Sequence, residues 1–290
     1  MSNLEQATLY VVATPIGNLG DITYRAVNVL SNVDIILAED TRTTLKLLKS
    51  LNIYNNQKLI SCHDFNEESR VEYVKETLNS NKTIALVSDA GTPLISDPGY
   101  KIISNLRQEN YKVVPIPGAS ALITALSVAG LPSDNFTFKG FLSSKKSKRQ
   151  QQIQEFKKIN TTVILYEAVH RIKYLLEDFL DILPEDTKIV VAKELTKKFE
   201  NFISGSIKTV HNYFQNNNKD TLKGEFVVIV DCNFNKKDID DNFNFEVNID
   251  DLLKNLLNEM PFNKAVKLAT AITKAKKNFI YERALKIKKD

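Results

Sequence analysis

The sequence predicts an α/β protein with a helical tail, and three observations support this fold class. Short apolar runs alternate with helical stretches through residues 1–117, as in a parallel or mostly parallel sheet with crossover helices. More closely spaced, more variable strands over 118–234 indicate a mixed sheet. Beyond a polar linker, amphipathic segments within 245–290 indicate a compact helical unit. We predict these three ranges as separate domains, with a hinge at Pro117-Gly118 between the first two and the polar linker before the third.

Apolar spacing defines the elements expected in the first domain. In chain order they are strand 8–13, helix 22–31, strand 33–38, helix 43–51, strand 58–61, a helix ending near 78, strand 84–87, helix 99–109 and strand 111–116. Each of these strands runs into a loop rich in Gly, Pro, Asp or Glu. Since parallel strands end at one edge of a sheet, these loops should gather there, where open α/β sheets bind ligands.

The same apolar spacing predicts the elements of the second domain and of the tail. The expected elements are helix 119–129, strand 136–141, a helix from about 146, strand 162–166, helix 170–182, strand 188–192 continued by F-I-S-G-S-I, a helix at about 206–214, a last strand in K-G-E-F-V-V-I-V, and tail helices 249–259, 263–276 and 279–288. The first of these helices is nearly uncharged, which predicts that it is buried, between the domains.

The stretch 84–99 is the most specialised part of the sequence. A buried strand passes into a loop with two Gly and two Pro, in a chain that has only 9 Gly and 8 Pro. Such a rigid loop at the end of an apolar strand predicts a ligand site, and an ordinary strand-to-helix connection is the alternative. We interpret its Asp89 and Asp97 as residues that shape and cap the loop.

Composition excludes several classes of protein. No apolar run reaches the about 18 residues of a membrane span, and the first residues do not form a secretory signal. Cys62 and Cys232 lie far apart, and with three scattered His they give no zinc spacing. We therefore expect a cytoplasmic protein without a disulfide or a metal.

Two segments concentrate positive charge although the net charge is only +4. Residues 143–158 and 254–290 are rich in Lys and Arg, and the run 235–253 between them is acidic. Localised basic patches suit a polyanion such as nucleic acid, and solvated helix faces are the alternative.

Common catalytic motifs do not match. The first loop has glycines at 17 and 20 only, so the G-x-G-x-x-G dinucleotide fingerprint fails. Walker A, G-x-S-x-G and H-E-x-x-H motifs do not occur either. Strand-end loops with carboxylates remain, without an obvious nucleophile.

A series of motifs nevertheless appears in one order: T-P-I-G-N-L-G-D-I-T, A-E-D-T-R, S-C-H-D-F-N-E, V-S-D-A-G-T-P-L-I-S-D-P-G, P-I-P-G-A-S-A, G-L-P-S-D, Y-E-A-V-H-R, A-K-E-L-T-K-K-F-E and K-G-E-F-V-V-I-V. Over residues 8–231 the chain closely resembles the ribosomal RNA small subunit methyltransferase I family of the tetrapyrrole methylase superfamily. The resemblance implies two α/β domains with a cofactor cleft between them and a C-terminal helical unit. It also implies a homodimer that uses S-adenosylmethionine to methylate the ribose 2′-hydroxyl of a cytidine in 16S ribosomal RNA.

Carried onto matching positions, the resemblance implies a cofactor pocket of Leu19, Gly91, Thr92, Ile95, Ser120, Ala121, Tyr166, Leu195 and Gly224. These positions are small, apolar or neutral, which suits a sulfonium cation better than Lys or Arg would. The exposed phosphates of RNA would contact the first basic segment through Lys145, Lys146, Lys148 and Arg149.

Strand ends supply the candidates for proton transfer and orientation of the hydroxyl, which are Glu39, Asp40, Arg42, His63, Glu67, Glu167, His170 and Arg171. Structural roles are the alternative, because Arg42 and Arg171 could pair with Asp40 and Glu167, and His63 could begin a helix.

Two other functions stay open at this point. The first loop P-I-G-N-L-G-D and the second loop D-A-G-T-P depart from the glycine patterns of corrin and porphyrin methylases, which favours RNA. A tetrapyrrole methylase would place methyl label on a macrocycle. A catalytically silent RNA-binding module would bind cofactor without methyl transfer.

Overall fold

The computed structural model describes residues 4–63, 65–216, 224–234, 249–273, 275 and 277–287. They belong to two compact units, Met1–Asn233 and Phe234–Asp290. Most of the predicted polar linker, the first residues of the predicted tail domain, and Lys274 and Lys276 of the basic tail lie outside the described residues.

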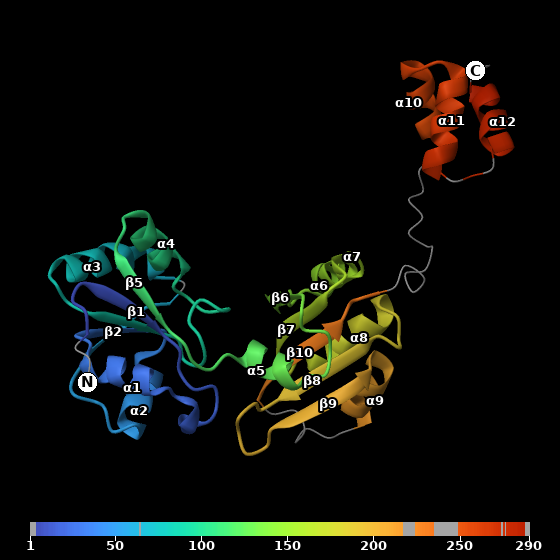
Figure 1. The fold of residues 1–290 in the computed structure, drawn as a ribbon. Helices are drawn as coiled ribbons and strands as arrows, with labels where there is room; N and C mark the ends of the chain where they lie inside the picture. Colours follow the sequence, from blue (N-terminus) through green and yellow to red (C-terminus); the bar gives the residue numbers. More distant parts are fainter. Residues whose placement is uncertain are drawn as a thin grey trace. The chain divides into compact units, whose positions relative to one another are not determined.

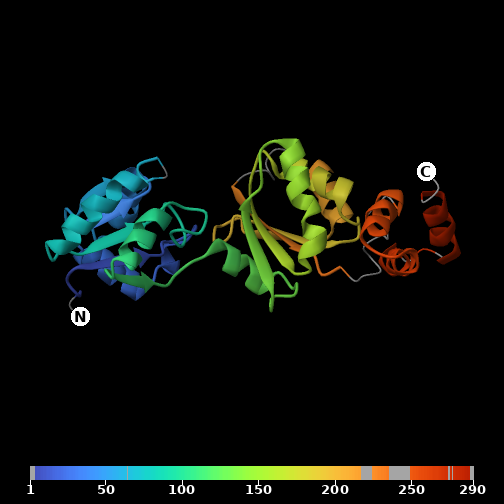
Figure 2. The same cartoon turned by 90° about the horizontal axis from the view of Figure 1, so that it is seen from above.

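The first unit contains two five-stranded sheets (Figure 1; Figure 2). The strands of the first sheet lie in the order β3-β2-β4-β1-β5 and are all parallel, as predicted. Its elements are β1 (Thr8–Val12), α1 (Tyr24–Asn32), β2 (Ile35–Ala38), α2 (Thr41–Ser50), β3 (Lys58–Ser61), α3 (Glu67–Asn79), β4 (Ile84–Val87), α4 (Tyr100–Gln108) and β5 (Lys112–Ile116).

Helices cover both faces of this sheet. One core cluster joins α1 and α2 to the sheet, and a second cluster joins α3 and α4 to the opposite face. All four residues of β2 and of β4 are buried for this reason, which explains their uninterrupted apolar sequences. The strand-end loops therefore lie at one edge of a rigid layer, as the sequence predicts.

The second sheet is mixed, in the order β6-β7-β10-β8-β9. Only the β6–β7 pair is parallel. Its elements are α5 (Ala121–Val128), β6 (Phe136–Phe141), α6 (Lys146–Gln154), α7 (Phe156–Ile159), β7 (Thr162–Ala168), α8 (Ile172–Ile182), β8 (Lys188–Lys193), β9 (Asn201–Ser206), α9 (Ile207–Asn216) and β10 (Glu225–Asp231). The predicted division into domains 1–117 and 118–234 stays a prediction.

One strand prediction is wrong. F-I-S-G-S-I does not continue the preceding strand but forms most of β9, which pairs antiparallel with β8. The chain reverses between them, with Glu194 and Thr196 in the left-handed region at φ 53° and 63°. Local apolar content cannot reveal such a reversal, because it depends on backbone conformation in a polar turn.

The second unit is a small helical bundle. Its helices are α10 (Ile249–Glu259), α11 (Phe262–Thr273) and α12 (Lys277–Ile287). They pack around residues such as Leu253, Val266 and Ile280, and Arg283 of α12 pairs with Asp250 of α10 at 2.8 Å. Across both units, none of the helices described is long and apolar enough to span a membrane.

Candidate active site

Backbone hydrogen bonds join the loops that follow β1 and β4. Thr14 and Gly91 exchange two of them, with N···O distances of 2.8 and 3.1 Å, and Gly91 has a φ of 87°. Thr92 then donates through its hydroxyl to the carbonyl oxygen of Ala119, at 3.0 Å. The segment leading into α5 is thereby held against the loop after β4.

A cavity of about 360 Å³ lies beside these loops and is lined from both sheets. Its lining residues are Ile16, Glu39, Asp89, Ala90, Gly91, Thr92, Ile95, Ser96, Asp97, Ser120, Ala121, Phe141, Tyr166, Glu194, Leu195, Lys197, Glu225, Phe226 and Val227. Three adjacent strands present Phe141, Tyr166 and Val227 side by side, and the Phe141 and Tyr166 rings meet edge-on at 5.7 Å. The cavity thus has an aromatic floor and a wall of loops.

All of the predicted cofactor residues except Leu19 and Gly224 line this cavity. Leu19 belongs to the 3₁₀ turn Leu19–Asp21 and is 46% exposed, and Ile16 of the same loop lines the cavity instead. Gly224 immediately precedes the lining residue Glu225 and packs against the Glu194 side chain with a φ of 90°. The role of these residues as cofactor contacts stays a prediction.

The lining is acidic rather than neutral, which corrects the expectation from sequence. Five of its residues are carboxylates: Glu39, Asp89, Asp97, Glu194 and Glu225. The single lining lysine, Lys197, pairs with Glu194 at 3.0 Å. A cavity with this excess of negative charge attracts a cation and repels phosphate.

Asp97 is the carboxylate with the most perturbed environment in the cavity. Burial raises its pKa to about 6, and the charges of Glu39, Asp89 and Glu225 act in the same direction, against a hydrogen bond from Ser88. A carboxylate in this range can accept a proton near neutral pH. From the sequence we interpreted Asp97 as a residue that shapes the loop. The one sequence signal that placed it near the cavity is that it shares a strand-end loop with Gly91.

Of the predicted catalytic groups, only Glu39 lines the cavity, where it accepts a hydrogen bond from the Asp89 amide at 3.2 Å. Arg42 does not line it. Its side chain is 85% exposed and pairs with Asp40 at 2.6 Å, and hydrogen bonds from Arg42 lower the pKa of Asp40 to about 2. This arrangement fits the alternative in which Arg42 forms a structural ion pair with Asp40.

His63 and Glu67 belong to the start of α3 instead of the cavity. The His63 carbonyl accepts hydrogen bonds from the amides of Asn66 and Glu67, so His63 forms the turn that begins the helix. Glu67 is buried and accepts a hydrogen bond from the Ile102 amide at the start of α4. Their placement fits structural roles.

Glu167 and Arg171 are also outside the cavity, because side chains alternate along β7. Tyr166 faces the cavity, whereas Glu167 points to the other face, where it is 1% exposed and 3.2 Å from Arg171. Arg171 donates to the carbonyl oxygens of Leu142 at 2.6 Å and of Ser143 at 3.2 Å. This pair holds the loop after β6, and neither residue lines the cavity. His170 between them is exposed and does not line the cavity.

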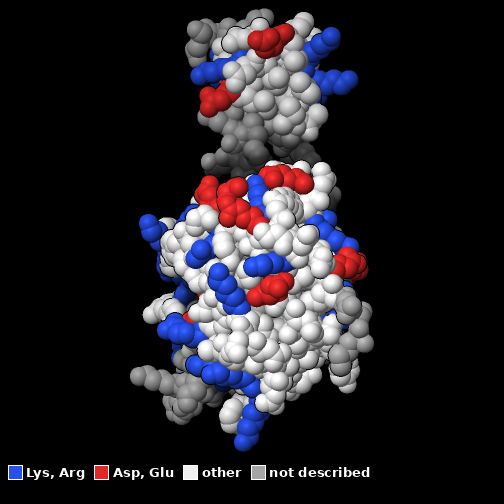
Figure 3. Space-filling view, turned by 90° about the vertical axis from the view of Figure 1, so that its left-hand side faces the viewer, with Lys and Arg blue, Asp and Glu red and all other residues white. Residues whose placement is uncertain are grey.

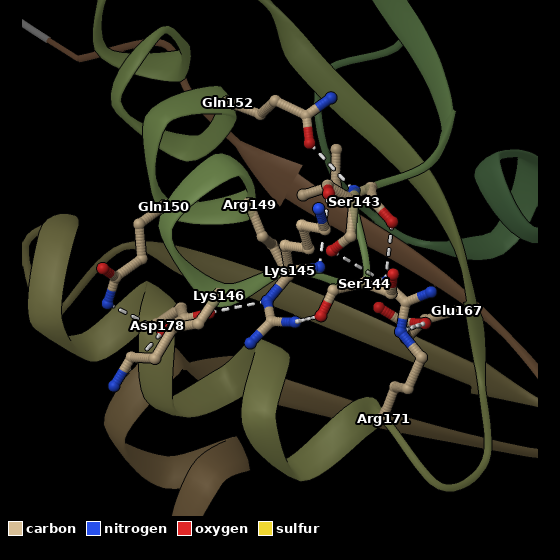
Figure 4. A network of polar contacts seen from close by, with 11 residues as sticks. Ser143, Ser144, Lys145, Lys146, Arg149, Gln150, Gln152, Glu167, Arg171 and Asp178 are labelled. Atoms are coloured by element: carbon tan, nitrogen blue, oxygen red, sulfur yellow. Dashed lines mark hydrogen bonds and ion pairs between the residues drawn. The ribbon is translucent and has the colours of Figure 1, made fainter.

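The first basic segment divides into a buried and an exposed part. Arg149 is 5% exposed and binds Asp178 of α8 at 2.6 Å, so it is not available to RNA (Figure 4). Lys145, Lys146 and Lys148 are exposed on the same helix start. On the face in Figure 3, positive and negative side chains are interspersed, so charge alone does not mark an RNA surface there.

In the part of the chain that the structure describes, no group of His, Cys, Asp and Glu could hold a metal ion.

Comparison with known proteins identifies the class first. The family described as Tetrapyrrole (Corrin/Porphyrin) Methylases matches residues 8–211, and the RsmI C-terminal HTH domain matches residues 245–288. Solved structures show the same fold. A diphthine synthase has a TM-score of 0.58 at 13% identity, covering 77% of this chain and 89% of that one. The cobalt precorrin-4 methyltransferase CbiF has a TM-score of 0.56 at 16% identity, covering 77% and 94%. The chain is therefore a methyltransferase with the tetrapyrrole methylase fold.

Sequence relatives narrow this to one family. Ribosomal RNA small subunit methyltransferase I of Vibrio cholerae is 44% identical over 276 residues, covering 94% of this chain and 93% of the relative. The enzyme of the same name from Escherichia coli is 42% identical over 282 residues, covering 97% and 95%. This chain belongs to the ribosomal RNA small subunit methyltransferase I family.

The buried Arg149–Asp178 pair gives a prediction about stability. Arg149→Ala leaves the Asp178 carboxylate without its main partner and should lower the free energy of unfolding by about 3–5 kcal/mol. Urea unfolding with an unchanged m value measures this loss. Lys148→Ala, on the exposed face of the same helix, should change stability by about 0.5 kcal/mol or less. Equal effects of the two substitutions would contradict a structural role for Arg149.

Proposed function

We propose that this enzyme transfers a methyl group from S-adenosylmethionine to the ribose 2′-hydroxyl of a cytidine in 16S ribosomal RNA. The observation that carries the proposal is an acid-lined cavity in a chain whose relatives, over nearly their whole length, are named ribosomal RNA small subunit methyltransferase I. Since the small ribosomal subunit is made in the cytoplasm, the enzyme would act there.

The residues present fit this cofactor. A cavity of about 360 Å³ is in the size range of small-molecule sites. Gly91, Ser120 and Ala121 leave room along one wall, and the surrounding carboxylates would stabilise a sulfonium charge. When bound, the cofactor supplies an electrophilic methyl group. A uroporphyrin-III C-methyl transferase from Thermus thermophilus with a TM-score of 0.52 was crystallised with S-adenosylhomocysteine, which supports the choice at the level of fold.

We assign the proton-accepting role to Asp97. An alcohol must lose its proton as it is methylated, and a positioned base contributes about 10²–10⁴-fold to such a step. The half-burial of Asp97 and its pKa of about 6 support this assignment. Glu39, which is hydrogen-bonded to the Asp89 amide, would help to fix the loop that carries the base.

Phosphate contacts would come from the exposed lysines at the start of α6, which are Lys145, Lys146 and Lys148. Arg149 is removed from this set because it binds Asp178. The Arg149–Asp178 and Arg171–Glu167 pairs would instead hold the segment from which these lysines project. A homodimer and the separate domains 1–117, 118–234 and 245–290 remain predictions.

The direct test is a map of ribose methylation in small-subunit RNA from cells that lack the gene. We expect one cytidine to lose its 2′-O-methyl group and to regain it when the wild-type enzyme is supplied. A complete methylation pattern in the deletion strain would contradict the proposed substrate. Transfer of methyl label to a corrin or porphyrin precursor would instead favour a tetrapyrrole methylase.

Asp97 predicts the pH dependence of the reaction. Below about pH 6 its carboxyl is protonated and cannot accept a proton, so kcat/KM should rise through that pH and level off above it. Asp97→Asn should lower turnover by about 10²–10⁴-fold and abolish this rise. Cofactor binding, followed by calorimetry, separates a loss of chemistry from a loss of affinity. A variant that keeps the wild-type pH profile would exclude Asp97 as the base.

The exposed lysines predict salt-dependent RNA binding. Replacing Lys145, Lys146 and Lys148 with Ala should reduce the slope of log K against log salt by about 2 to 3, since each phosphate contact contributes about 0.7–0.9. Cofactor affinity, measured on the same triple variant, should stay at the wild-type value because these lysines do not line the cavity. An unchanged slope would indicate that the lysines only solvate the helix.

A further inference from the structure

Three aromatic side chains near helix starts that follow strands of the first sheet are highly exposed, and two of them, unlike Tyr24 at the start of α1, belong to α3 and α4, which share one face of the sheet. Phe65, just before α3, is 98% exposed, and Tyr100, the first residue of α4, is 72% exposed. Single exposed apolar residues are common on protein surfaces, but large rings held at a ligand-binding edge are typical of recognition surfaces.

The two rings belong to neighbouring helix starts that are fixed to each other. Glu67, two residues after Phe65, is buried and accepts hydrogen bonds from the amides of Lys101 and Ile102, which follow Tyr100. Figure 1 shows α3 and α4 together on one face of the sheet. The carboxylate of Glu67 therefore fixes the spacing between the segments that carry the rings.

The segment that carries Tyr100 continues directly from the cavity lining. Asp97 lines the cavity, and only Pro98 and Gly99 separate it from Tyr100. Gly99 has a φ of 130°, and an added Cβ would lie 2.9 Å from the Cδ2 atom of Leu86, so this connection is short and tightly packed. Tyr100 is therefore three residues along the chain from the cavity lining.

We propose that Phe65 and Tyr100 form a stacking platform for a nucleobase of single-stranded RNA next to the methylated nucleotide. This inference rests on the proposed function, because it names how the same site holds its RNA. A ribose hydroxyl can reach an enclosed cavity only if its nucleotide leaves the base stack, and the adjacent base then loses a stacking partner. An aromatic ring at the rim replaces that partner without reading sequence.

The position of the platform next to the proposed active site favours RNA as its occupant. Charge does not decide the occupant, because Lys101 pairs with Glu68 at 3.0 Å and Arg42, in the first turn of α2, pairs with Asp40 at 2.6 Å. Aromatic rings bind single-stranded nucleic acid by stacking on bases of any sequence. A second copy of this chain is the competing occupant, and sedimentation of the variants distinguishes it from RNA.

The experiment uses the full-length enzyme with the double substitution Phe65→Ala and Tyr100→Ala. The conservative pair Phe65→Trp and Tyr100→Phe keeps both rings. Tyr174→Ala removes an aromatic side chain of α8 that is 58% exposed and does not line the cavity. Substrates are 16S ribosomal RNA and small subunits from cells that lack the gene, and a short single-stranded RNA carries 2-aminopurine beside a cytidine.

We expect the double alanine variant to raise KM for RNA about tenfold or more. Its kcat should stay within about twofold of the wild-type value, because the platform binds ground state and transition state alike. Wild-type enzyme should quench 2-aminopurine fluorescence, and the alanine variant should not. The ring-keeping variant should restore both properties, and cofactor affinity should be the same in all proteins.

Three results would contradict the proposal that the two rings form a stacking platform. One is an unchanged KM with unchanged quenching, and another is an equal effect of Tyr174→Ala. The third is a shift to smaller particles in sedimentation that accounts for the loss of activity, since this would assign the rings to an interface between copies. If wild-type enzyme transfers no methyl group to either RNA substrate, the proposed function itself fails, which differs from a defect confined to the variants.

Discussion

The pair of backbone hydrogen bonds between Thr14 and Gly91 is the constraint on which the site depends. It joins the ends of β1 and β4, which are adjacent strands of the first sheet. Thr92 extends the link to Ala119, at the entrance to the helix that packs on the second sheet. Because main-chain atoms make the bridge, the loop side chains remain available to line a cavity. Conformational entropy would otherwise oppose bringing these loops together.

The sequence predicts the elements of the fold well where apolar spacing is local. Strands 58–61, 84–87 and 136–141 and helix 249–259 have the predicted limits. Long-range pairing decides what the sequence could not show. Tyr166 and Glu167 are neighbours in one motif, yet the pleat of β7 directs one to the cavity and the other into the buried network with Arg171.

The positions of charged residues could also be predicted only in part from the sequence. The run of Lys and Arg after β6 is visible in the sequence, but its division into exposed lysines and a buried arginine depends on Asp178, 29 residues beyond Arg149. The acidity of the cavity also escaped prediction, because Glu39, Asp97 and Glu225 come from three separate strand ends. The two signs of charge thus occupy different places, the carboxylates in the cavity lining and the exposed lysines at a helix start.

The loop after β4 carries Leu94 and Ser96 at φ values of 73° and 67°. Residues other than Gly and Asn rarely adopt this left-handed region of the backbone. Such residues persist at functional sites because the surrounding structure holds them there. A search for thermostable variants would therefore select Gly or Asn at these positions. Both positions lie in the loop that carries Asp97, so selection for stability and selection for the proposed base would act on the same short segment.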